Sequence, residues 1–196
     1  MPKIEVHANP FFSLIGKTLQ KEELIDILTG AKAELDDWDD AEGILKIELN
    51  DTNRPDLWST AGLARQIKIL LENKLPTYDF FSSDKDMKDA GERIINVDPG
   101  LKCIRPYIAA FAARGNTIDD NFLIDIIQTQ EKICENFGQK RKAIAMGVYR
   151  ANMIQYPVSY IAADPKETSF VPLGFEEEMN LLTIIKDHPK GVDYGG

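Results

Sequence analysis

Side chains that could support chemistry are few and scattered in this chain of 196 residues. Neither histidine, His7 or His188, belongs to a serine or cysteine arrangement typical of nucleophilic catalysis. The two cysteines, Cys103 and Cys134, have the spacing of neither a metal site nor a disulfide framework. We expect both to be free thiols in a core, in a reducing compartment. The sequence therefore assigns no catalytic residue.

An acidic run around Trp38 could suggest a calcium site, because hard cations prefer several oxygen ligands. Its carboxylates belong to Glu34, Asp36, Asp37, Asp39 and Asp40. The run lacks the loop glycine and the terminal glutamate of an EF-hand, and charge runs at turns are ordinarily solvated. The scattered glycines, among them Gly138, Gly147 and Gly174, form no phosphate-binding loop. We expect a solvated turn here, and neither a metal site nor an ATP site in the chain.

The composition is that of a soluble globular protein with an acidic surface. The chain is 43% hydrophobic and 28% charged, with a formal net charge of −9. Phosphate contacts need clustered Lys and Arg, so this charge argues against nucleic-acid binding by bulk electrostatics, and any RNA contact must be local or shared. No stretch approaches a signal peptide or the ~20 apolar residues of a membrane span. We expect a cytoplasmic protein without a membrane or DNA partner.

The periodicity predicts two mixed α and β units, over residues 1–81 and 94–196, joined by an Asp- and Lys-rich connector at 82–93. The first unit should contain strands at Lys3–His7 and Ile44–Leu49, a helix at Lys21–Ala33, and a helix capped by Ser59 that ends near Asn73. The second should contain strands at 94–97, 107–113, 143–149 and 158–163, and helices at 119–138 and 176–186. We expect the helix at 119–138 to turn an apolar stripe towards a core: Leu123, Ile126, Ile127, Gln130, Ile133, Cys134 and Phe137.

A loop of distinctive chemistry precedes the Ser59 cap. Pro55 fixes its own φ and disfavours a helical Arg54, while the side chains of Asn53 and Asp56 can bond neighbouring amides. These properties favour a rigid loop in which Arg54 and Asp56 form an ion pair or a cap. We therefore expect Asn53, Arg54, Pro55 and Asp56 to have a structural role.

The segment from Glu48 to Arg65, which includes this loop, resembles the Asn-Arg-Pro-Asp signature of phenylalanyl-tRNA synthetase β subunits. Two further blocks, Gln130–Val148 and Phe170–Gly191, resemble the archaeal and eukaryotic cytosolic branch of that family, in the same order along the chain. The resemblance covers nearly all of the sequence, and it implies the N-terminal piece of a longer subunit.

The resemblance also implies an α+β fold. Residues up to about Phe80 match the family's small N-terminal domain (B1-like). Residues from Ile94 match the first part of the domain that edits mischarged tRNA (B3/B4-like), which has a mainly antiparallel sheet. In the family, the β subunit pairs with an α subunit in a heterotetramer that charges tRNA(Phe) with phenylalanine, using ATP and Mg2+. Those cofactor sites match later segments, so we expect no cofactor in this piece.

Editing is needed because an apolar pocket rejects an added hydroxyl by only about a hundredfold. A second, hydrolytic site must bind the tyrosyl hydroxyl of mischarged tRNA through polar groups. Gln130 and Arg141 match a glutamine and an arginine of the family's editing pocket. An amide both donates and accepts hydrogen bonds, and a guanidinium can hold a carboxylate or the tRNA terminus. Alternatively, Gln130 bonds a neighbouring loop and Arg141 is one of several solvated charges.

Three hypotheses follow for the function. The chain is a synthetase fragment that carries part of the editing site but is inactive by itself. Alternatively, it is a non-catalytic scaffold or tRNA-contact module that supports the assembled enzyme. The third is an independent deacylase, which would need a complete polar pocket within these residues.

Overall fold

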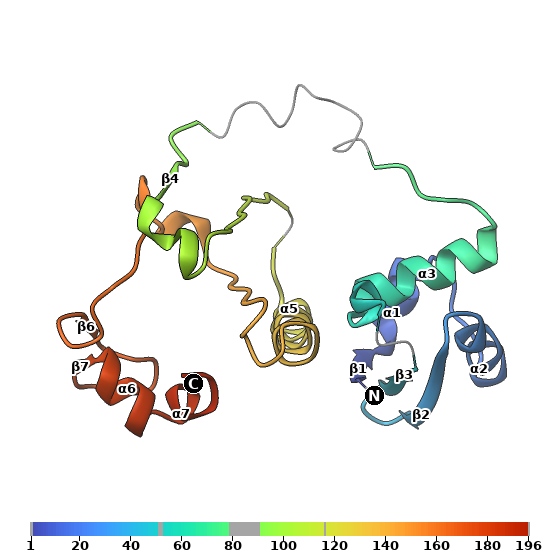
Figure 1. The fold of residues 1–196 in the computed structure, drawn as a ribbon. Helices are drawn as coiled ribbons and strands as arrows, with labels where there is room; N and C mark the ends of the chain where they lie inside the picture. Colours follow the sequence, from blue (N-terminus) through green and yellow to red (C-terminus); the bar gives the residue numbers. More distant parts are fainter. Residues whose placement is uncertain (1, 51–52, 79–90, 116, 196) are drawn as a thin grey trace. The chain divides into compact units, whose positions relative to one another are not determined.

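The computed structural model describes residues 2–50, 53–78, 91–115 and 117–195 (Figure 1). Its contacts divide the chain into two compact units. The first combines Met1–Tyr78 with Asn116–Val148, and the second combines Asp79–Gly115 with Tyr149–Gly196. The predicted division into 1–81, 82–93 and 94–196 remains a prediction, and most of its connector lies outside the described residues.

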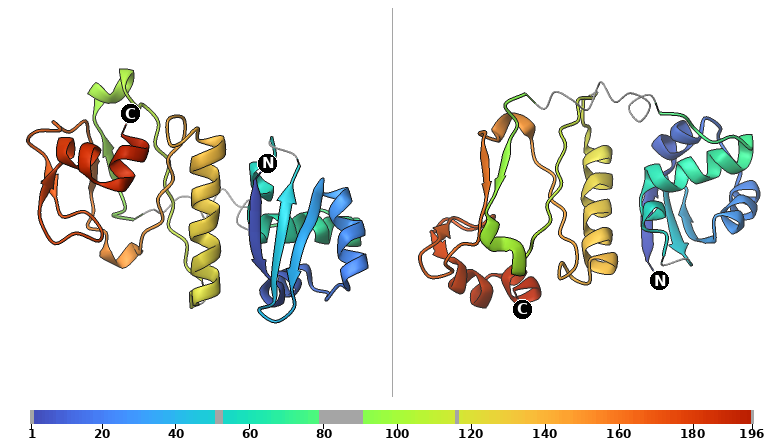
Figure 2. Two further views of the ribbon diagram at one scale, coloured as in Figure 1. Left: turned by 90° about the horizontal axis from the view of Figure 1, so that it is seen from below. Right: turned by 45° about the horizontal axis from the view of Figure 1, so that its top comes forward.

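The first unit contains an antiparallel sheet of three strands in the order β1-β3-β2, which Figure 2 shows side by side. Its strands are β1 (Lys3–His7), β2 (Ala33–Asp39) and β3 (Ile44–Leu49). The predicted strands at 3–7 and 44–49 are confirmed. Strict alternation in β3 buries Leu45, Ile47 and Leu49 on one face.

Most of the acidic run forms β2, so the predicted turn is wrong there, although its carboxylates are exposed to solvent as predicted. Ala33 is buried, and Leu35 and Trp38 pack partly against the core, which gives the segment one apolar side. A bulge between Leu35 and Asp37 adjusts the register. Pairing with β3 then outweighs the low strand propensity of the aspartates.

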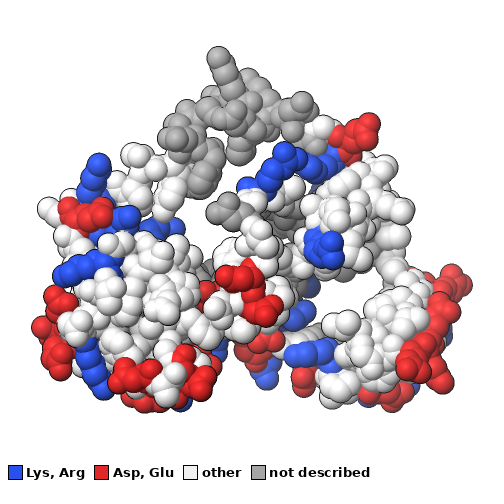
Figure 3. Space-filling view, turned by 180° about the vertical axis from the view of Figure 1, so that it is seen from behind, with Lys and Arg blue, Asp and Glu red and all other residues white. Residues whose placement is uncertain are grey.

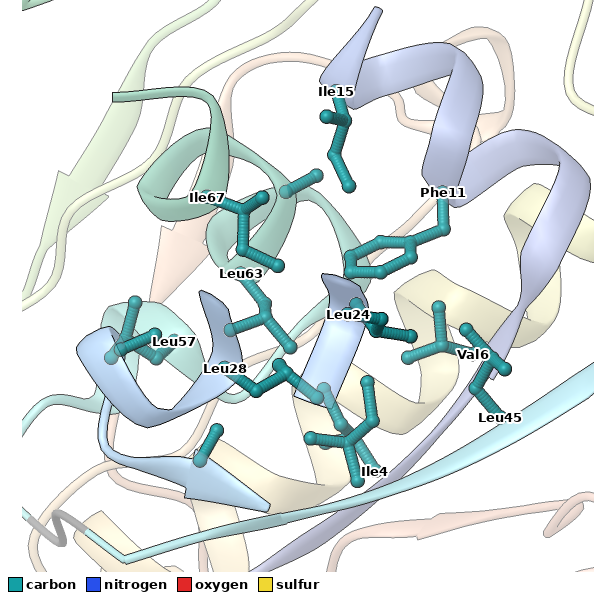
Figure 4. Close-up of a cluster of buried hydrophobic side chains, with 14 of the residues drawn as sticks. Ile4, Val6, Phe11, Ile15, Leu24, Leu28, Leu45, Leu57, Leu63 and Ile67 are labelled. Atoms are coloured by element: carbon teal, nitrogen blue, oxygen red, sulfur yellow. The ribbon is translucent and has the colours of Figure 1, made fainter. Parts of the chain in front are cut away.

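The helices α1 (Ala8–Ile15), α2 (Lys21–Gly30) and α3 (Thr60–Glu72) complete the first unit. Figure 4 shows Phe11, Leu24 and Leu63 pointing into the cluster that also holds Ile4 and Val6 of β1. The predicted helix at 21–33 ends at Gly30. The helix α1 was not predicted, because it follows β1 without a linker and has no side-chain cap.

The predicted limits of α3 are confirmed. Ser59 Oγ accepts a hydrogen bond from the Gly62 N–H at 3.0 Å, and Asn73 ends the helix in the left-handed region at φ 49°.

A further helix, α5 (Asp120–Lys132), belongs to the first unit and lies beside β1 (Figure 2). Asp119 caps it by accepting from the Phe122 N–H at 2.8 Å, and a π-helical turn, Ile133–Phe137, continues it to Gly138. The helix is confirmed, but its stripe is not a buried core face. No residue of α5 itself is buried, and of the stripe only Cys134, in the following turn, is buried.

The second unit has two strand pairs. The strand β4 (Ile95–Val97) runs parallel to β5 (Val158–Tyr160), and β6 (Ser169–Phe170) runs antiparallel to β7 (Met179–Asn180). Two short helices, α6 (Leu181–Asp187) and α7 (Pro189–Tyr194), follow. With the antiparallel sheet of the first unit, these elements confirm the predicted α+β class.

Several predictions beyond residue 94 are wrong. The segments 107–113 and 143–149 are irregular, because no described strand supplies the ladder partner that a strand needs. The helix predicted at 176–186 begins only at Leu181, since 179–180 pair with β6 and Asn180 caps the helix. Cys103 is exposed at the end of a 3-10 helix, Pro99–Cys103, whereas Cys134 is buried as predicted.

Candidate functional site

The signature loop forms a charged cluster around Asp56. The Arg54 side chain donates to both carboxylate oxygens of Asp56 at 2.9 Å, and Arg65 Nη2 donates to Oδ2 at 3.1 Å. Hydrogen bonding from Arg54 lowers the pKa of the Asp56 carboxyl below its ordinary value. The predicted ion pair of Arg54 and Asp56 is therefore confirmed. Its side chains are partly exposed, so the pair orients the loop more than it stabilises the fold.

Packing beneath this cluster holds the loop against the core. Pro55 opens a single 3-10 turn, Pro55–Leu57, and the side chains of Leu57 and Trp58 are buried. Gly62 of α3 lies directly under the backbone carbonyl of Asp56, where a Cβ atom would overlap the oxygen. The loop thus packs closely against the start of α3, and its predicted structural role stays a prediction.

Gln130 lies half-buried on α5. Helical spacing places it next to Ile126, Ile127, Ile133 and Cys134, at positions three and four residues away. Its amide therefore lies within an apolar part of the helix surface. Such surroundings strengthen a hydrogen bond to a polar group that is brought there.

Arg141 follows the π-helical turn in an unusual backbone segment. Gln139, Lys140 and Arg141 have φ values of 51°, 55° and 66°, which residues other than glycine rarely adopt in succession. The Arg141 N–H donates to the Cys134 carbonyl at 3.0 Å, and the Met146 N–H donates to Cys134 Sγ at 3.1 Å. The two predicted pocket residues, Gln130 and Arg141, are thus carried by one helix and the turn that follows it.

Sequence reasoning missed two polar residues on another side of α5. The Gln128 amide bonds the backbone of Glu5 in β1, and Asp125 Oδ1 accepts from Thr60 Oγ1 at 2.6 Å. Burial raises the pKa of the Asp125 carboxyl, and the Thr60 hydroxyl partly opposes this shift. Asp125 and Gln128 are three residues apart, so they share a side of the helix that lies away from the apolar stripe. This spacing was the signal in the sequence that could have indicated a second contact face.

Two surface hollows lie in the first unit. One, of about 830 Å³, lies between α1 and the β2–β3 turn and includes Phe12 and Trp38 in its lining. The other, of about 420 Å³, is lined by Pro2, Trp58, Asn136, Phe137 and Gln139. Neither is lined by Gln130 or Arg141.

The described residues contain no group of three or more His, Cys, Asp or Glu side chains placed to hold a metal ion. None of their helices is long and apolar enough to cross a membrane. Figure 3 shows lysines and arginines scattered among carboxylates on the visible face.

Comparison with known proteins gives consistent matches. Residues 1–73 match the family described as "Phe-tRNA synthetase beta subunit B1 domain". The "Phenylalanine–tRNA ligase beta subunit" of Borreliella afzelii is 48% identical over 194 residues, which are 99% of this chain and 34% of the relative. The corresponding subunit of Borreliella burgdorferi (strain ZS7) is 50% identical with the same coverage. This chain thus spans about a third of the length of these relatives.

A solved structure is also similar. It is an N-terminal fragment of the phenylalanyl-tRNA synthetase beta subunit from Pyrococcus horikoshii, with a TM-score of 0.84 and 38% identity. The match covers 99% of this chain and 55% of that one. The similar sequences come from Borreliella, whereas the similar structure comes from Pyrococcus. These matches do not assign the chain to one branch of the family, so the archaeal and eukaryotic type stays a prediction. The relatives confirm the predicted similarity to an aminoacyl-tRNA synthetase β subunit, and residues 1–73 of this chain match the Phe-tRNA synthetase β-subunit B1 domain family.

Proposed function

We propose that this chain is the N-terminal part of a phenylalanine–tRNA ligase β subunit and carries part of a site that hydrolyses tyrosyl-tRNA(Phe). The observation that carries this proposal is the similarity to subunits of that name over 99% of the chain. The whole enzyme would be a cytoplasmic heterotetramer with an α subunit, of the archaeal and eukaryotic cytosolic type. It would charge tRNA(Phe) with phenylalanine, using ATP and Mg2+ bound outside this chain.

The surroundings of Gln130 support a role in recognising tyrosine. Its amide can accept from and donate to a phenolic hydroxyl, and its helical neighbours Ile126 and Ile127 offer apolar contacts for the ring. Phenylalanine lacks the hydroxyl and would leave a partly desolvated amide without that partner, which costs binding free energy. An amide within an apolar surface therefore favours tyrosine over phenylalanine.

Arg141 is suited to the tRNA end of the substrate. Its guanidinium can bind phosphate through paired hydrogen bonds, and its backbone is bonded to Cys134 in the turn that follows α5. In the proposed reaction, water attacks the ester carbonyl and the bond to the terminal ribose oxygen breaks. The ribose oxygen takes up a proton, and tyrosine and tRNA(Phe) are released.

The test compares tyrosyl-tRNA(Phe) hydrolysis by the 196-residue chain and by the full-length β subunit assembled with its α subunit. We expect hydrolysis by the assembled enzyme only, with loss of rate in Gln130→Ala and Arg141→Ala and unchanged phenylalanine charging. Glu131→Ala and Lys142→Ala are matched controls from neighbouring exposed positions. Unchanged hydrolysis in both Gln130→Ala and Arg141→Ala would remove the site assignment. Equal hydrolysis by the short chain would instead support an independent deacylase.

A non-catalytic scaffold or tRNA-contact module is the second candidate. It is favoured by the observation that neither of the two hollows described above is lined by Gln130 or Arg141. This function predicts normal editing in both variants, together with weaker tRNA binding when residues 1–73 are removed from the assembled enzyme.

A further inference from the structure

We propose that Gln128 is a positioning residue for editing. It attaches α5 to the free edge of the N-terminal sheet and so fixes where Gln130 and Arg141 lie. This inference rests on the proposed editing function, and it gives the B1 domain a specific task in that reaction.

The free edge of β1 is where the attachment occurs. Because β3 is the central strand, the other side of β1 pairs with no strand among the described residues. The Leu49 N–H donates to Pro2 O and the Ala8 N–H donates to Gly43 O, so even-numbered residues direct their peptide groups towards β3. Glu5 is odd-numbered, and its N–H and C=O therefore point outwards at the middle of the open edge.

Gln128 supplies the groups that a neighbouring strand would supply. Its Oε1 accepts from the Glu5 N–H at 2.7 Å, and its Nε2 donates to the Glu5 carbonyl at 2.9 Å. A primary amide carries the same donor and acceptor as a peptide group, so both edge groups of Glu5 are satisfied. The contact also covers an edge that would otherwise be open to pairing with another chain.

A second contact prevents α5 from pivoting about Gln128. Asp125 lies three residues earlier, on the same side of the helix, and accepts from the Thr60 hydroxyl at 2.6 Å. Thr60 is the first residue of α3 and is buried, so the carboxylate sits near the positive end of that helix. Two contacts on two elements fix both the position of α5 along the edge and its rotation.

This attachment determines where the pocket residues lie. At about 100° per residue, Gln130 is roughly 200° around the helix from Gln128 and faces away from the sheet. Any rotation or shift of α5 therefore moves the Gln130 amide by a similar amount. Arg141 moves with it, because its N–H is bonded to the Cys134 carbonyl in the turn that continues the helix. Misplacement by about 1 Å is enough to slow a reaction substantially.

The test uses the full-length β subunit assembled with its α subunit and measures single-turnover hydrolysis of tyrosyl-tRNA(Phe). Gln128→Ala should lower the rate constant about tenfold, with unchanged apparent affinity for tRNA and unchanged phenylalanine charging. Glu131→Ala, an exposed position on the same helix, is the matched control and should retain the wild-type rate. Because Gln128 acts through Gln130, the double variant Gln128→Ala/Gln130→Ala should be no slower than Gln130→Ala alone.

Hydrogen exchange checks the contact itself. A peptide covering β1 should exchange faster in Gln128→Ala, because the Glu5 N–H loses its acceptor, and should be unchanged in Glu131→Ala. A normal hydrolysis rate in Gln128→Ala beside a slow Gln130→Ala would overturn this inference and leave the editing site standing. Normal rates in Gln130→Ala and Arg141→Ala would overturn both proposals. A lowered affinity for tRNA in Gln128→Ala, without a slower rate constant, would also contradict positioning.

Discussion

Substitution of Gly62 by alanine should destabilise the first unit, although alanine is the better helix former. Propensity alone favours Gly62→Ala by about 1 kcal/mol. However, the new Cβ would overlap the carbonyl oxygen of Asp56 and lie 2.9 Å from Ser59 Oγ. The obstacle is backbone, held by buried Trp58 and by the ion pairs of Asp56, so it cannot move without moving the loop. Overpacking of this kind costs about 1–3 kcal/mol or more, and we expect a net loss of about 2 kcal/mol.

Gly30→Ala is the matched control from α2 of the same unit. There the added Cβ would lie 3.2 Å from Leu70 Cδ1, the end of a side chain that is 40% exposed and free to turn away. We expect a change between zero and about 1 kcal/mol in the stabilising direction.

Urea unfolding followed by tryptophan fluorescence measures both variants. The two tryptophans of the chain, Trp38 and Trp58, both belong to the first unit, so the signal reports that unit alone. With a slope of about 2 kcal/mol/M, the midpoint of Gly62→Ala should fall by about 1 M. A midpoint at or above the wild-type value would refute the argument, as would an equal fall in Gly30→Ala.

Three other substitutions test the electrostatics and the core. The pKa of Asp56 lies below its ordinary value of 3.8, so its stabilisation is present above that pH and is lost as the pH falls through the lower folded value. Asp56→Asn should therefore unfold more easily than wild type at pH 7, by at most about 1 kcal/mol because the pair with Arg54 is exposed, and the difference should vanish in acid. Burial raises the pKa of Asp125 above 3.8, so its ionised carboxylate destabilises the folded state at pH 7. The Asp125→Asn side chain can still accept from Thr60 and carries no charge. This variant should therefore be slightly more stable than wild type at pH 7, but not below pH 3.8. Leu63→Ala should cost about 3 kcal/mol in thermal unfolding, since the side chain is fully buried.

Local patterns were sufficient for much of the N-terminal fold. Alternation located Lys3–His7 and Ile44–Leu49. The Ser59 cap predicted the start of α3, and the predicted end near Asn73 is also confirmed. In the signature loop, side-chain chemistry alone predicted the Arg54–Asp56 pair. These features depend on neighbours within a few residues, where sequence reasoning works best.

Features that depend on distant partners were missed. The charged segment 33–39 is a strand because β3 pairs with it, and 143–149 is irregular because no described strand does. Gln128 could not be recognised as an edge contact, because Glu5 is 123 residues away in sequence. Gln130 and Arg141 came from family resemblance, and the structure adds that one helix and its turn carry both.

The most direct test of the proposed function is the accumulation of tyrosyl-tRNA(Phe) when the assembled full-length enzyme is given ATP, tRNA(Phe) and excess tyrosine. The wild-type enzyme should accumulate almost none, whereas Gln130→Ala and Arg141→Ala should accumulate it steadily and charge phenylalanine at the normal rate. If both variants keep the product as low as wild type does, these two residues are not part of an editing site.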